Sequence, residues 1–65
     1  MDRVKQALEV AHGKQIAEIY AIFEGSILIA DGNHQDIHDA EAKFKFAVIH
    51  ANHVLAKALA IADGI

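Results

Sequence analysis

Histidines are the residues of this chain best suited to chemistry, because imidazole titrates near neutral pH and is the commonest metal ligand in proteins. His34, His38 and Glu41 follow one another at intervals of four and three residues. On a helix this spacing places the three side chains along one edge, where two imidazoles and a carboxylate can hold a divalent cation. Spacing alone does not establish a site, and solvated polar residues at the start of a helix explain the same pattern. These three residues are therefore a candidate site for a divalent cation, but solvated polar residues are the favoured interpretation, and the sequence predicts no bound cofactor.

Glu9 and His12 form a Glu-x-x-His pair, the spacing that di-iron carboxylate bundles use. A complete di-iron site also needs carboxylates on the facing helix, whereas an antiparallel hairpin places His53 and Lys57 opposite this pair. The pattern instead favours His12 as a histidine at the edge of a core with a hydrogen-bond partner. The alternative is haem ligation by His12 and His53 across a helical bundle.

Residues for nucleophilic or phosphoryl-transfer chemistry are scarce. The chain has no Cys and no Thr, its single serine is Ser26, and no glycine-rich phosphate loop is present. A chain of 65 residues also leaves little room for the insertions that build a ligand pocket. The sequence therefore predicts no catalytic residues and no enzymatic activity.

The elements that position these residues are set by one turn signal, the run Asp31, Gly32 and Asn33. Gly32 can adopt the left-handed conformation that ends a helix, and Asn33 can cap a new one, with Asp36 three residues later. On both sides apolar residues recur at intervals of three and four, and no Pro interrupts them. These features predict an all-α, two-helix antiparallel hairpin: a single domain 1–65 with helices 2–30 and 34–62 joined by a turn at 31–33.

Each predicted helix has a main apolar stripe, which we call its inner stripe. In the first helix Gln15 and Ser26 interrupt the stripe: Gln15 is typical of a polar layer that sets the register of a bundle, and Ser26 with Gly25 of a close-packing or bend site. The inner stripe of the first helix consists of Val4, Leu8, Ala11, Ile16, Ile19, Ile22, Phe23 and Ile29. That of the second helix consists of Ile37, Ala40, Phe44, Ala47, Val48, Ala51, Leu55, Ala58, Leu59 and Ala62.

The second helix carries a further apolar group on its other side, which we call the outer seam. Its residues are Phe46, Ile49, His53, Ala56 and Ala60. Exposed apolar patches usually mark contact surfaces, and we expect these five residues to form a subunit interface. The hydrophobic fraction of 54% is high for so short a chain, which has no disulfide to stabilise it. We therefore expect the hairpin to self-associate into a four-helix dimer or a higher helical oligomer.

The composition favours a small assembly or protein–protein interaction module whose partner is the chain itself. The alternatives are a metal- or haem-binding bundle that uses the histidines and, less favoured, an RNA-binding four-helix dimer. The net charge of −3 argues against a nucleic-acid partner, since phosphate binding needs clustered Lys and Arg. No signal peptide is recognisable, and no apolar run reaches the length of a membrane span, so we expect no membrane span and, by default, a cytoplasmic protein.

Overall fold

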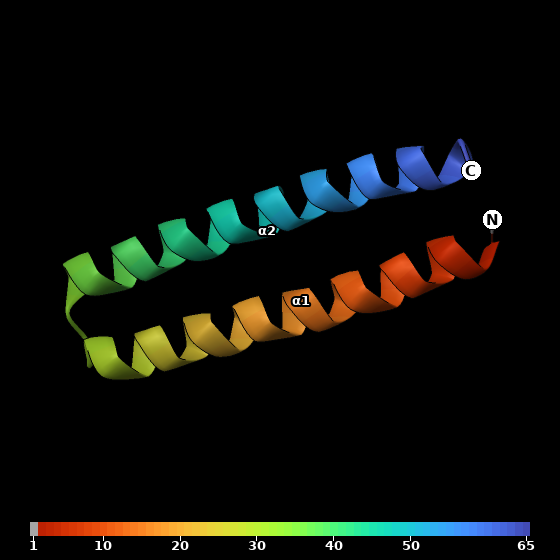
Figure 1. Ribbon diagram of the computed structural model, residues 1–65. Helices are drawn as coiled ribbons and strands as arrows, with labels where there is room; N and C mark the ends of the chain where they lie inside the picture. Colours follow the sequence, from red (N-terminus) through yellow and green to blue (C-terminus); the bar gives the residue numbers. More distant parts are fainter. Residues whose placement is uncertain (1) are drawn as a thin grey trace.

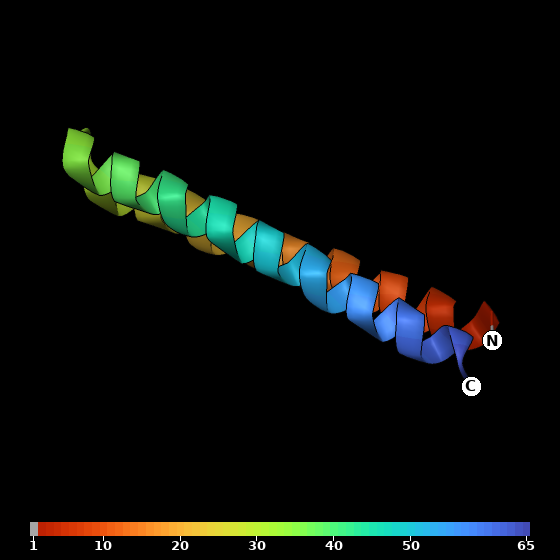
Figure 2. The same cartoon turned by 90° about the horizontal axis from the view of Figure 1, so that it is seen from above.

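The computed structural model describes residues 2–65 and consists of two long helices. Helix α1 spans Asp2–Ala30 and helix α2 spans His34–Asp63. They lie side by side in opposite directions, and both termini are at the end away from the turn (Figure 1). Seen from above, α2 follows α1 along its whole length (Figure 2). The predicted all-α antiparallel hairpin is confirmed, and its helices form a flat rod of 48 × 15 × 7 Å.

The turn has the local chemistry that its residues predict. Asp31 and Gly32 both have left-handed backbone angles, with φ of 47° and 83°. Glycine adopts this conformation without steric cost, and Asp is among the few other residues that tolerate it. The Asn33 amide donates to the Ala30 carbonyl at 2.9 Å, which closes the turn. The Asn33 side chain then accepts a hydrogen bond from the Asp36 amide at 3.0 Å, so Asn33 is the N-cap of α2.

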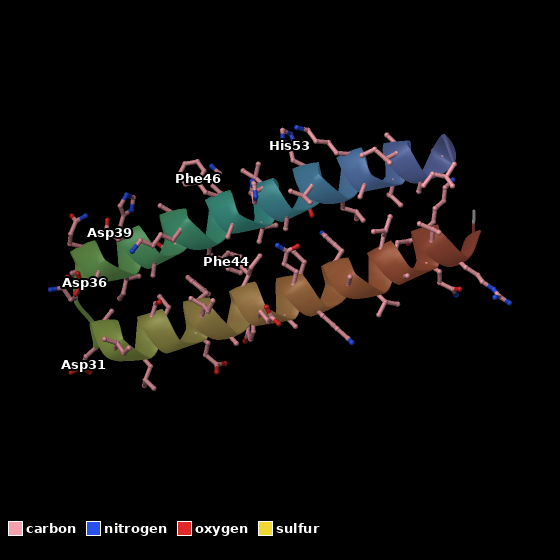
Figure 3. All side chains as sticks on the ribbon, viewed as in Figure 1. Asp31, Asp36, Asp39, Phe44, Phe46 and His53 are labelled. Atoms are coloured by element: carbon pink, nitrogen blue, oxygen red, sulfur yellow. The ribbon has the colours of Figure 1, made fainter. Side chains whose placement is uncertain are left out.

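The contact between the helices is formed by the inner stripe of α2 and part of that of α1. Every residue predicted for the α2 stripe is buried or half-buried. The Phe23 and Phe44 rings lie 4.7 Å apart in the half of the hairpin nearer the turn, and Phe44 points toward α1 (Figure 3). Among the described residues the buried apolar positions are all alanines: Ala30, Ala40, Ala51 and Ala62. The core is therefore a thin strip, in which larger side chains keep part of their surface exposed.

Burial along the hairpin recurs at intervals of eleven residues. Ala40, Ala51 and Ala62 are buried at this interval, and Leu8 and Ile19 precede Ala30 at the same interval. Eleven residues complete close to three turns of an α-helix, so one face stays directed at the partner helix with little supercoiling. This spacing explains why two helices of about 30 residues stay in contact from end to end.

A pair of glycine substitutions tests the turn. Gly32→Ala should lower the free energy of unfolding by about 1 kcal/mol, because its φ of 83° suits glycine and strains other residues. Gly13→Ala should raise it by about 1 kcal/mol, since Gly13 lies inside α1 and no atom lies within 4 Å of the added Cβ. Urea denaturation of the three proteins at equal concentration measures both changes. If both substitutions stabilise the protein, the turn conformation is wrong.

Candidate functional site

One broad side of the hairpin, where the two helices meet in an open groove, forms the main candidate surface. Three shallow hollows of about 150, 130 and 250 Å³ follow one another along it. Each is smaller than the roughly 300–1,000 Å³ of a typical ligand pocket. We call this surface the groove face. Its residues are Leu8, Ala11, Gln15, Ile19, Ile22, Ser26 and Ile29 from α1 and Ala40, Lys43, Ala47, Ala51, Val54 and Ala58 from α2.

Three residues predicted for the inner stripe of α1 belong to this open surface instead. Ile22 is 70% exposed and Ile29 is 85% exposed, and Ala11 is also exposed. The expectation that they face α2 is therefore wrong. The apolar arc of α1 is wider than the strip that one neighbouring helix can cover, and these residues lie on its uncovered side. Large apolar side chains in this position are typical of a surface that contacts a further helix.

The outer seam lies on the side of α2 that faces away from α1. Phe46 and His53 point outward, whereas Phe44 points toward α1 (Figure 3). Phe46 is 67% exposed and Ile49 is 45% exposed, and His53, Ala56 and Ala60 are exposed as well. The five residues follow one another at alternating intervals of three and four, the spacing of a helix–helix seam. Their role as a subunit interface remains a prediction.

The structure gives His12 a partner on the facing helix. Its Nε2 atom lies 2.9 Å from the Asn52 side-chain oxygen, so the imidazole N–H donates across the helix pair. His12 is half-buried, which agrees with a histidine at the edge of the core. The residue opposite His12 is Asn52 rather than the expected His53 or Lys57. His53 points away from α1 (Figure 3), so the hairpin does not bring His12 and His53 together.

The candidate metal residues His34, His38 and Glu41 are all exposed at the start of α2. Within residues 2–65, no group of three or more His, Asp or Glu side chains is placed to hold a metal ion. Nearby, the Gln35 side-chain amide donates to the Asp39 carboxylate at 2.9 Å. The geometry therefore gives the proposed metal site no support beyond the sequence spacing.

An ion pair between Lys5 and Asp63 joins the two helices at their free ends. The Lys5 ammonium donates a hydrogen bond to the Asp63 carboxylate and attracts its charge, and both effects lower the pKa of Asp63 below its usual 3.8. Asp63 is well exposed, so solvent weakens the pair. The contact links the two helices at their free ends.

Comparison with known proteins gives no indication of what these surfaces do. No protein-family model matches the chain, and no curated protein or solved structure shows significant similarity to it. By length and mean hydropathy alone, α2 reaches the lower limit for a helix able to cross a membrane, with 1.2 over its most apolar window. His50, Asn52, His53 and Lys57 lie in the second half of that helix, and polar groups at such positions are costly within lipid.

Metal binding can be tested by thermal melts with and without Zn²⁺. Because the three candidate ligands are exposed and are not grouped around a common point, we expect Zn²⁺ in slight excess to leave Tm unchanged. A cation held by the native state would raise Tm by mass action. A rise in Tm that disappears in His38→Ala and persists in the control His50→Ala would establish the site and contradict this expectation.

The Lys5–Asp63 pair predicts a pH dependence. Because the folded-state pKa of Asp63 is lowered, its stabilising effect is complete above the usual value of 3.8 and is lost as the pH falls through the folded-state pKa. Asp63→Asn should therefore lower Tm slightly at pH 7 and leave it unchanged near pH 2. Glu24→Gln is the matched control, since Glu24 pairs with no cation in the described part of the chain. An equal loss of Tm at both pH values would exclude the ion pair as its cause.

Proposed function

We propose that this hairpin is a self-associating module that assembles with further copies of itself and serves as a structural or interaction unit. The observation that carries the proposal is the surface area. The hairpin exposes 5152 Å², whereas a compact folded chain of 7.0 kDa exposes about 4,000 Å². The excess of about 1,100 Å² belongs to a fold that lacks a second layer.

The size of this excess suits a protein–protein contact. A standard interface buries about 800 Å² on each partner. The groove face supplies apolar residues along the length of both helices, including the highly exposed Ile22 and Ile29. Packing a further pair of helices against it would complete a four-helix bundle, in which each helix covers two neighbours.

The outer seam supports assembly beyond a dimer. It faces away from α1 and is separate from the groove face, so the two surfaces can be occupied together (Figure 3). Phe46 and Ile49 provide its largest exposed apolar area. We propose that the groove face forms the primary contact and that the outer seam joins these units when the protein concentration is high.

Adjacent residues on α1 offer a matched test of the primary contact. Ile29 lines the groove face, whereas its neighbour Leu28 lines none of the hollows of that face, and they are 85% and 80% exposed. Ile29→Gln should raise the Kd of the dimer about ten- to a hundredfold, because burying an isoleucine contributes about 1.5–3 kcal/mol. Leu28→Gln should change Kd by no more than about twofold. Sedimentation equilibrium over a range of concentrations measures both constants.

Two results would contradict the proposal. A wild-type protein that is folded and monomeric at micromolar concentration would exclude self-association as its working state. Co-flotation with lipid vesicles, together with the absence of discrete oligomers in solution, would instead assign the apolar surface to a membrane.

A further inference from the structure

We infer that the groove face is covered by a second copy of the chain, docked face to face with the two turns at opposite ends of the dimer. This inference rests on the self-association proposed above and adds its geometry. The occupant and its direction follow from the exposed area and from the distribution of charge along the rod.

A second copy fits the groove face better than a peptide or a small molecule does. The apolar residues extend along both helices, so the occupant must be as long as the hairpin and about as wide. A symmetric contact between two copies uses the same patch on both subunits, and one groove face therefore covers the other completely. Its hollows of about 130–250 Å³ are too shallow for a ligand and suit side chains from a facing helix pair.

Two face-to-face arrangements keep neighbouring helices antiparallel: the turns meet at the same end, or they lie at opposite ends. Charge separates the two. Residues 17–48, the half next to the turn, contain six acidic and two basic residues, a net charge of −4 with His neutral. The rest of the chain contains three acidic and four basic residues, a net charge of +1. Turns at the same end would place two halves of net charge −4 side by side. Turns at opposite ends place each acidic half beside a weakly basic half of the partner.

Acidic groups are concentrated close to the turn itself. Asp31, Asp36 and Asp39 lie at this end of the rod (Figure 3), and all three are exposed. Asp36 and Asp39 also line the hollow nearest the turn, so they border the contact surface. Two copies with their turns together would bring six carboxylates to one end of the interface. In the opposite arrangement, this end lies beside the partner's free end, which carries Arg3 and Lys57.

The register of the opposite arrangement also suits the residues of α1. The two-fold axis passes near the middle of α1, so Gln15 lies close to Gln15 of the partner subunit. Their side-chain amides can then donate and accept hydrogen bonds reciprocally. Ala11 then lies across from Ile19 of the partner subunit, and a small residue opposite a large one fills the space between two helices. Gln15 therefore acts as the polar layer that fixes the register.

The distance between two labelled turns tests the arrangement. The chain has no Cys, so a single His34→Cys substitution carries one nitroxide label per subunit. In the dimer, pulsed electron–electron double resonance should give a separation between the two labels close to the 48 Å length of the hairpin. A label at Lys45→Cys, near the middle of the rod, should give a much shorter separation and shows that the dimer has formed.

The outcomes distinguish this inference from the function on which it rests. Short separations at both positions would place the turns together and overturn the inference, while self-association would stand. Absence of dipolar coupling at both positions, with a monomer by sedimentation, would overturn the inference and the proposed function alike. A long separation at His34→Cys with a short one at Lys45→Cys supports both.

Discussion

A pair of helices buries one strip of each partner, and this limit governs the rest of the structure. The buried positions are small alanines, and the aromatic contact between Phe23 and Phe44 lies beside them. Other apolar residues of α2, such as Phe46, Ile49 and Val54, fall on the outer seam and the groove face. One contact strip cannot remove these residues from water, so a fold of two helices leaves an excess of apolar surface exposed.

The turn fixes which residues meet across this strip. Because Asp31 and Gly32 reverse the chain within two residues, His12 lies opposite Asn52, and Lys5 lies opposite Asp63 at the free ends. These polar contacts lie at the borders of the apolar strip, where solvent reaches them. They agree with the register that the turn fixes, while packing of the inner stripe supplies most of the stability of the hairpin.

Polar residues on α2 keep its two apolar surfaces apart. Lys43, His50 and Lys57 recur at intervals of seven, so they share one edge of the helix, and all three are exposed. This edge borders the groove face at Lys43, which lines two of its hollows, and separates that face from the outer seam. A partner helix that covered one surface would leave the charged edge in water and the other surface free. The arrangement suits ordered assembly better than unspecific aggregation.

The sequence by itself determined the hairpin, because Asp31, Gly32 and Asn33 specify the turn through local backbone chemistry, and the spacing of α2 identified its contact residues. It failed for Ile22 and Ile29, since periodicity shows that a side is apolar but not how much of it one neighbour covers. The interval of eleven residues does not separate them either, because Ala11 and Ile22 are open and are also eleven residues apart. Asn52 as the partner of His12 depends on the rotation of two packed helices, which is decided by tertiary contact alone. Only the tertiary structure therefore defines the candidate surfaces, because side-chain packing fixes the width of the strip that one helix covers on the other.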